Sequence, residues 1–278
     1  MGLHEPTPRP RVALRWWAPV GRTRPAKRHM SSSLRIGVVI PVYNGADDLR
    51  ETLTAFRALP ATLLAQLEVV VADGASTDDT LHVMSTFMDV VRHADSRDDQ
   101  GVYDAMNRGA GLVQAPYVWF MGAGDLPIAE GLYTLLERLE GDVGHACTVL
   151  AMAPREPGVP AEFVPHFGKS LDWRNTLHHQ GVVVPTAWVK QRPLSTEYTV
   201  LSDYAWMLDC RNAGQHIECH PGLALASVAG GGLSRNFDAA LYREERRMKH
   251  GRVSRAAALA HWVWLPAKWA FKQVSKAR

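Results

Sequence analysis

The sequence predicts an α/β fold built on a single open, mostly parallel β-sheet. Short β-branched runs alternate with amphipathic helical segments over residues 34–125, and each run ends in turn-forming residues. The runs are also apolar throughout, which is typical of parallel strands buried on both faces. We therefore expect the polar residues that follow these strands to share one sheet edge, where open α/β sheets bind ligands.

The first half of the chain carries this alternation in regular order. Strands are expected at 34–44, 67–76, 88–95 and 117–125. Helices are expected between them, at 46–59, 77–88 and 101–113. In the first helix, Leu49, Leu53 and Phe56 fall on one face and acidic residues occupy the first turn, as in helices that pack on a sheet.

The pattern loosens after residue 126. We expect a helix at 132–139, an irregular stretch at 141–178, a short strand at 178–185, a helix at 201–214 and a glycine-rich loop at 226–237. No internal repeat is visible.

Composition sets broad limits on function. The 278 residues allow a sizeable core, and 46% hydrophobic and 21% charged residues are ordinary for a globular protein. A net charge of +3 is too small to argue for nucleic acid as a partner. The three cysteines lack metal-ligand spacing, which favours free thiols and a cytoplasmic location. No run of 18 apolar residues predicts a membrane span.

Both ends of the chain are basic. Residues 1–33 are rich in Pro and Arg and lack the apolar core of a signal peptide, so we expect a disordered extension or, alternatively, a membrane-surface arm. In residues 241–278, lysines are interleaved with Trp262, Trp264, Trp269 and Phe271. That mixture predicts binding to an anionic membrane surface, in two short pieces separated by Pro266. The alternative is a terminal helix packed on the domain.

Polar residues follow three of the predicted strands. Tyr43 and Asn44 come after the first, Asp73 after the second and Asp125 after the fourth. Turn chemistry would explain any one of them. Their occurrence at three strand ends favours a shared ligand crevice.

Several ordered motifs resemble one enzyme family. They are "VVIPVYNGADDL", "VVVADGASTDDT", "DDQGVYDAMNRGAGL", "WFMGAGD", "HHQGVVVP", "LSDYAWML" and "GGGLS". Together they resemble the family 2 inverting glycosyltransferases of the GT-A fold, in particular the colanic-acid-type enzymes of exopolysaccharide synthesis. The resemblance implies a GT-A domain over 34–240, with a Rossmann-like nucleotide-sugar half at 34–126 and a smaller acceptor half at 127–240.

The resemblance also implies a reaction. A sugar would move from a nucleotide diphosphate sugar, most simply a UDP-sugar, to a lipid-linked or oligosaccharide acceptor. A divalent metal, Mg²⁺ or Mn²⁺, would assist. The enzyme would work at the cytoplasmic face of the inner membrane, in cell-surface polysaccharide assembly.

The donor residues follow from the same resemblance. The loop of Pro41, Val42, Tyr43 and Asn44 would meet the base, and Asp73 would hold the uracil or ribose through its carboxylate. The other implied donor contacts are Asp98 or Asp99, Asp104, Asn107, Gly124 and Gln180. For Asp104 a surface pair with Arg108, four residues later, is the alternative.

Asp125 is the implied metal ligand. The family's usual Asp-x-Asp signature is reduced here, because Gly122 and Gly124 stand in the places of its two acids. One carboxylate together with diphosphate oxygens can hold Mg²⁺ or Mn²⁺. A plain turn residue and a ribose contact are the alternatives.

Asp203 stands in the place of the family's catalytic base, with Ser202 where a Glu is usual. Helix capping is its structural alternative, and His179 is the rival base. No Ser-His-Asp or cysteine nucleophile stands out, consistent with one-step inversion. A catalytically silent sugar-nucleotide scaffold remains the alternative function. A nucleotidyltransferase is disfavoured, because "PVYNGADD" lacks the basic glycine-rich loop such enzymes carry after the first strand.

Overall fold

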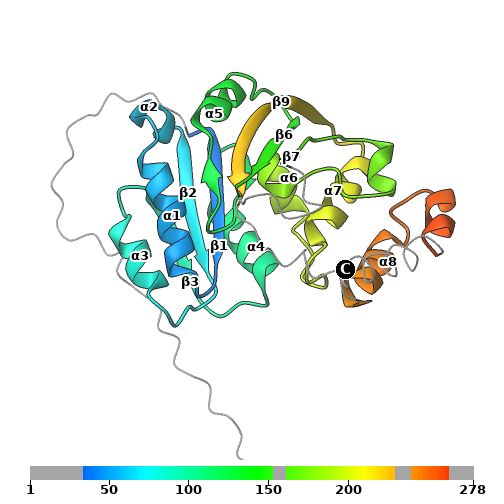
Figure 1. Cartoon of the computed structure of the whole chain (residues 1–278), viewed down its shortest axis with the longest axis horizontal. Coiled ribbons are helices and arrows are strands. Elements are labelled where there is room, and N and C mark those ends of the chain that lie inside the picture. The colour runs from blue at the N-terminus through cyan, green and yellow to red at the C-terminus, as the bar shows by residue number, and fades with distance from the viewer. Residues whose placement is uncertain (1–33, 153–160, 229–238, 263–278) are drawn as a thin grey trace, which may run out of the picture. The chain divides into compact units, whose positions relative to one another are not determined.

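A nine-stranded mixed sheet runs through the computed structural model, which describes residues 34–152, 161–228 and 239–262 (Figure 1). The strand order is β3-β2-β1-β4-β8-β6-β9-β5, and β7 pairs with β6. The strands are β1 Ile36–Val42, β2 Leu67–Asp73, β3 Val91–Ser96, β4 Tyr117–Phe120, β5 Leu126–Pro127, β6 Gly144–Ala151, β7 Glu162–Phe163, β8 Val182–Pro185 and β9 Ile217–Val228. The helices are α1 Ala46–Arg57, α2 Ala61–Leu64, α3 Thr80–Thr86, α4 Val102–Leu112, α5 Ala129–Leu136, α6 Thr186–Gln191, α7 Ser202–Asn212 and α8 Ala239–Lys249, with 3₁₀ turns η1 Lys169–Asp172 and η2 His179–Gly181.

The first four strands form the parallel half of the sheet and confirm the predicted fold class. β2 pairs with β3, and β1 pairs in parallel with both β2 and β4. Alternate residues of β1 serve two core layers: Ile36, Val38 and Ile40 pack with α1 and α3, whereas Val39 packs with α4 on the other face (Figure 1). Burial on both faces explains why these strands are apolar throughout.

A glycine in α4 allows this helix to approach the sheet closely. A Cβ atom added at Gly109 would lie 2.4 Å from Cγ1 of Val39. The predicted helix at 101–113 therefore forms despite its glycines, because one of them serves helix–sheet packing.

Two strands in the second half overturn the prediction of irregular structure. β6 lies inside the stretch 141–178 and pairs with β8, β7 and β9. β9 runs for 12 residues and includes the start of the predicted loop at 226–237, whose remainder from 229 lies outside the described residues. Polar residues interrupt the apolar pattern of both strands, and their partners lie about 70 residues away in sequence. His145 in β6, for example, faces His220 in β9.

The beginning of the basic C-terminal segment packs on the domain. α8 buries Tyr242, Glu245, Met248 and Lys249, and the Lys249 ammonium donates to the Trp173 carbonyl at 3.0 Å. A further helical stretch covers 255–262. Trp264, Trp269, Phe271 and the predicted kink at Pro266 lie outside the described residues, as does the extension 1–33. None of the helices in the described ranges combines the length and apolar character that a membrane span requires.

Candidate active site

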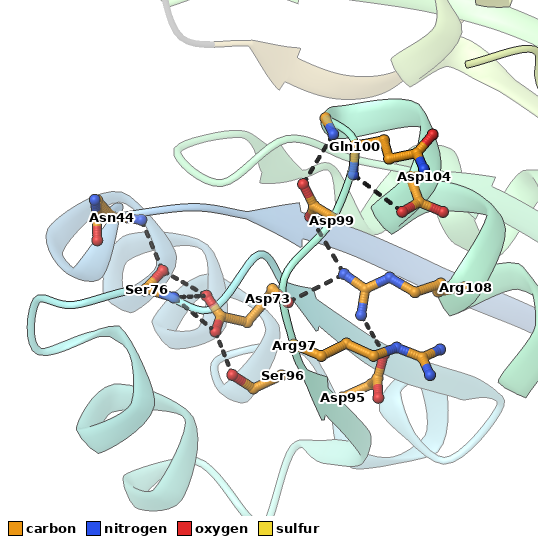
Figure 2. A network of polar contacts seen from close by, with 11 residues as sticks. Asn44, Asp73, Ser76, Asp95, Ser96, Arg97, Asp99, Gln100, Asp104 and Arg108 are labelled. Carbon is orange, nitrogen blue, oxygen red and sulfur yellow. Dashed lines mark hydrogen bonds and ion pairs between the residues drawn. The ribbon is translucent and has the colours of Figure 1, made fainter. Parts of the chain in front are cut away.

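The carboxyl ends of β1, β2 and β3 meet at one sheet edge, which we call the donor edge (Figure 2). Asn44 sits in the turn after β1 with a φ of 48°. Its backbone N–H donates to Ser76 Oγ at 2.7 Å, and its side-chain oxygen accepts from the Thr77 N–H at 2.8 Å. Asn44 therefore ties the β1 turn to the β2 turn.

The buried carboxylate of Asp73 holds the turn that follows β2. It ends β2, is completely buried, and accepts hydrogen bonds from the hydroxyls of Ser76 and Ser96, each at 2.5 Å. The Ser76 N–H adds a third donor at 3.1 Å. The carboxylate thus fixes the turn that holds Asn44, and its predicted contact with uracil or ribose remains a prediction.

Arg108 of α4 neutralises two further acids at this edge (Figure 2). Its guanidinium pairs with Asp95 and, at 3.2 Å, with Asp99, and it donates to the Asp73 carbonyl at 3.1 Å. Asp104 instead accepts from the Gln100 N–H at 3.1 Å. The surface pair between Asp104 and Arg108, offered above as an alternative, is therefore wrong, because Arg108 is turned toward the sheet edge.

The Tyr43 ring and the Asp99 carboxylate both approach the Gly74 backbone closely, and we call these three residues the Gly74 cluster. The Tyr43 side chain is 66% exposed. A Cβ atom added at Gly74 would lie 3.3 Å from the Tyr43 ring and 2.8 Å from Asp99 Oδ2, so glycine permits this close approach. An exposed ring beside a carboxylate and bare backbone is suited to a flat, hydrogen-bonding group such as a nucleobase.

Three predicted donor residues lie away from the Gly74 cluster. The Val42 side chain is in the core, and its carbonyl accepts from the Gly74 N–H at 2.9 Å. Pro41 pairs with Ala72 within the sheet. The side-chain NH₂ of Asn107 donates to the Leu194 carbonyl at 2.8 Å, and its side-chain oxygen accepts from the Leu194 N–H at 2.9 Å. The Asn107 side chain therefore holds a loop that is distant in sequence.

The loop after β4 explains why Asp125 stands alone. Gly124 has a φ of 91°, a conformation that disfavours any side chain. A Cβ atom at Gly122 would lie 2.9 Å from Asp125 Oδ2. This turn therefore favours glycine at both positions where the usual acids would stand.

Asp125 is almost completely buried in that turn. Its Oδ2 accepts from the Gly122 N–H at 2.7 Å and from the Gln180 amide at 3.2 Å. It can give a metal one protein carboxylate, which fits Mg²⁺ or Mn²⁺ where diphosphate oxygens and water supply the remaining ligands.

Asp203, in the first turn of α7, lies beside His179 of η2. Asp203 Oδ2 lies 3.2 Å from His179 Nδ1, and Oδ1 lies 3.2 Å from the Tyr103 hydroxyl. Leu201 is the N-cap of α7, and Asp203 lies in the first turn of this helix, where an acid is favourable for its own sake. Burial pushes the pKa of Asp203 upward, but His179, the Tyr204 N–H and Tyr103 outweigh it and hold that pKa below its ordinary value.

One turn connects this couple to Asp125. His178, His179 and Gln180 are consecutive: His179 meets Asp203, Gln180 meets Asp125, and the rings of His178 and His179 lie 5.7 Å apart and nearly parallel. Burial and the neighbouring His179 lower the pKa of His178 to about 4, so it is neutral at pH 7. The structure therefore brings the predicted metal acid and both predicted bases to one turn.

The sequence pattern assigned no role to Tyr103 or Ser76, and it suggested the wrong partner for Arg108. Tyr103 falls on the apolar face of a helix, where an aromatic residue is usually core, so only its partner Asp203 reveals its polar role. Ser76 follows Asp73 by three residues, a spacing typical of a turn, and this spacing predicts a contact between the two side chains.

A second group of metal-ligating residues occurs elsewhere in the described residues. His145, Glu218 and His220 offer ligand atoms within 4.8 Å of one another. His145 contacts Tyr117, the first residue of β4, and so lies at the opposite end of the sheet from Asp125. The facing histidine nitrogens are 3.1 Å apart while the ring centroids are 5.4 Å apart, the edge-to-edge geometry of an N–H···N hydrogen bond. A cation would require these rings to turn.

The family comparison gives a clear match. A sequence model described as "Glycosyl transferase family 2" matches residues 37–196, which include the donor edge, Asp125 and the turn with His179.

Curated relatives match over shorter stretches. A "PGL/p-HBAD biosynthesis glycosyltransferase Rv2957" from Mycobacterium tuberculosis (strain ATCC 25618 / H37Rv) is 40% identical over 86 residues, covering 27% of this chain and 33% of the relative. The "Uncharacterized glycosyltransferase YibD" of Escherichia coli (strain K12) is 25% identical over 173 residues, covering 61% of this chain and 47% of the relative. The matched part therefore spans between a third and a half of these relatives.

Solved structures share the fold. Staphylococcus aureus TarS 1-349 in complex with UDP-GlcNAc superposes with a TM-score of 0.61 at 17% identity, covering 77% of this chain and 65% of TarS 1-349. The mannosyltransferase PcManGT of Pyrobaculum calidifontis, in complex with GDP-Man and Mn²⁺, gives a TM-score of 0.56 at 17% identity and covers 84% and 70%. At this identity the likeness establishes the fold alone.

Proposed function

The chain belongs to glycosyl transferase family 2, and we propose that it transfers a sugar from a nucleotide diphosphate sugar to a lipid-linked or oligosaccharide acceptor with inversion at the anomeric carbon. The observation that carries this proposal is the turn 178–180, which contacts Asp125 on one side and Asp203 on the other. A transferase needs a base close to the site that holds the departing diphosphate. This turn lies between Asp125, the proposed metal ligand for the diphosphate, and Asp203, a member of the proposed base pair.

The donor nucleotide is proposed to lie along the donor edge. Tyr43 offers a flat exposed face beside Gly74, and Asp99 offers a carboxylate oxygen at the same place. These groups suit uracil, which presents both a ring face and an N–H donor. A UDP-sugar is therefore the first donor to test, in keeping with the UDP-GlcNAc complex of TarS 1-349.

Asp125 is the proposed metal ligand, with Gln180 beside it to orient the phosphates or the metal-bound water. A bound Mg²⁺ or Mn²⁺ would neutralise the charge of the departing diphosphate. The Mn²⁺ complex of PcManGT supports a metal in this fold.

The His179–Asp203 pair is proposed to remove the proton of the acceptor hydroxyl. Both Asp203 oxygens face partners, and its side chain is 12% exposed against 34% for His179. We infer that Asp203 holds Nδ1–H of His179 and stabilises the imidazolium, which leaves Nε2 to accept the proton. If Asp203 were itself the base, His179→Gln would retain most of kcat, whereas the pair predicts a large loss.

A donor screen tests the proposal directly. Thermal unfolding would be measured with UDP-, GDP- and TDP-sugars in the presence of MnCl₂, followed by release of the nucleotide as turnover. A bound donor raises the melting temperature in proportion to its occupancy. Turnover that is abolished in both Asp203→Asn and Asp125→Ala would exclude the scaffold function, whereas a donor that stabilises the chain without any turnover would support it. If no donor shifts the melting temperature, the transferase function fails.

Membrane association and pathway are further parts of the proposal. In the described part of the C-terminal segment, Leu259 and Trp262 are 72% and 65% exposed, and the Arg246 guanidinium lies 4.9 Å from the Trp262 ring centroid. Exposed apolar groups beside arginines suit the anionic inner leaflet. Binding at the inner leaflet would bring the enzyme close to a lipid-linked acceptor. Such an acceptor is used in cell-surface polysaccharide synthesis by the colanic-acid-type enzymes that the sequence resembles.

Vesicle flotation tests the membrane part separately. The chain should float with phosphatidylglycerol vesicles, not with phosphatidylcholine vesicles, and Trp262→Ser should weaken binding. Equal flotation with both vesicle types would contradict an anionic-surface site.

A further inference from the structure

Glu244 of α8 holds the backbone that leads into α7. Its carboxylate accepts three consecutive backbone N–H groups: Thr199 at 3.1 Å, Val200 at 2.9 Å and Leu201 at 2.8 Å. Leu201 is the N-cap of α7, and Asp203 lies two residues further on. A carboxylate facing successive N–H groups forms charge-assisted bonds, which are stronger than those between neutral groups.

The same short segment, residues 197–201, meets α8 at further points. The Arg247 guanidinium donates to the Glu197 carbonyl at 3.2 Å. Arg252, which follows α8, donates to the Tyr198 hydroxyl at 3.1 Å. Segment 197–201 is therefore attached to the C-terminal part of the chain through both its main chain and a side chain.

Segment 197–201 is coupled directly to the His179–Asp203 pair. The Tyr103 hydroxyl donates to the Val200 carbonyl at 2.5 Å and lies 3.2 Å from Asp203 Oδ1. Val200 is thus fixed from two sides, with its N–H on Glu244 and its carbonyl on Tyr103. A shift of this peptide moves the group that binds Asp203 and moves the first turn of α7.

We propose that Glu244 is a positioning residue for the His179–Asp203 pair, so that α8 forms part of the catalytic unit. The proposal rests on the proposed function of that pair. Without the carboxylate, three N–H groups before α7 lose their acceptor, and Asp203 loses its fixed orientation toward His179. Catalytic groups must be held within a fraction of an ångström, so misplacement lowers turnover while donor binding at the distant sheet edge is kept.

The test compares Glu244→Ala and Glu244→Gln with Glu137→Ala, a matched change at an exposed residue beyond α5. Turnover of the donor found in the screen gives kcat and KM, UDP titration with MnCl₂ gives affinity, and amide hydrogen exchange follows residues 199–206 without substrate. We expect Glu244→Ala to lower kcat by about 10- to 100-fold, with KM and UDP affinity within about twofold of the parent. Exchange at 199–201 should quicken. Glu244→Gln should fall between, because its single carbonyl oxygen can still accept from part of the segment.

The outcomes separate the two proposals. Faster exchange with unchanged kcat, or equal losses in kcat and UDP affinity, would overturn a positioning role. Unchanged exchange would overturn the contact itself. If the parent chain turns over no donor, the proposed function fails, whereas the hydrogen-exchange result still decides whether Glu244 fixes the start of α7.

Discussion

The donor edge and the His179–Asp203 pair are built in opposite ways. At the donor edge, Asp73 binds Ser76 three residues later, and Arg108 binds Asp99 nine residues earlier. Around the pair, His179 meets Asp203, Tyr103 meets Asp203 across 100 residues, and Glu244 meets Leu201 across 43. The donor edge is therefore shaped within neighbouring βα units, whereas the His179–Asp203 pair, the proposed base, depends on segments that meet only when the whole domain has folded.

The strongest test of this contrast is Asp203→Asn. Loss of the charge removes the partner of the His179 imidazolium, so kcat should fall about 10³-fold. UDP affinity should stay within about twofold of the parent, because the donor edge keeps its own contacts. Steady-state turnover and calorimetric titration would measure both, with Asp47→Asn on the exposed side of α1 as the matched control. A variant that keeps a tenth of the parent kcat would remove Asp203 from the mechanism.

His178 should make the catalytic side sensitive to acid. Its pKa is lowered to about 4 in the folded chain, against an ordinary value of 6.5, so the unfolded chain binds the extra proton between these values. The free energy of unfolding should therefore fall as the pH drops from 6.5 to 4, by at most about 3 kcal/mol. Urea unfolding at several pH values would measure the slope, and His178→Phe should flatten it. An equal slope in the variant would assign the effect to other groups.

Asp73→Asn should disturb the donor edge and leave the pair intact. An amide cannot accept from all three donors that Asp73 serves, so the free energy of unfolding should fall by about 2 kcal/mol and UDP affinity about 10-fold. Turnover at saturating donor should change much less. Urea unfolding and UDP titration would measure the two losses. If kcat fell as far as in Asp203→Asn, the separation of the two regions would be wrong.

The smallest effect is expected at the loop between the two regions. Gly124→Asp restores an acid of the usual family signature, but the φ of 91° disfavours a side chain there. The variant should lose about 1 kcal/mol of unfolding free energy and gain no Mn²⁺ affinity. Gly222→Asp is the control, since it has open space and no such φ. A gain in Mn²⁺ affinity would show that the loop can rearrange to host a second acid.

The same contrast decides what the sequence could predict. The parallel strands and α1 can be predicted from local sequence, because each is apolar or periodic within its own length. Asp73 ends β2 and Asn44 follows β1 as expected, whereas β4 ends at Phe120 and leaves Asp125 in the loop that follows. β6 and β9 carry buried polar residues whose partners lie far along the chain, so their local pattern resembles a loop. The roles of Asn107 and Glu244 could not be predicted for the same reason. The side-chain oxygen of Asn107 accepts from a backbone N–H 87 residues away, and those of Glu244 accept from N–H groups 43 to 45 residues away.

Crystals grown with UDP and MnCl₂ would test the whole account most directly, through the anomalous signal of manganese. We predict the uracil against Tyr43 and Asp99, the manganese between the diphosphate and the Asp125 carboxylate, and the His179 ring facing the β-phosphate side. Manganese bound by His145, Glu218 and His220, or UDP bound away from the donor edge, would contradict it.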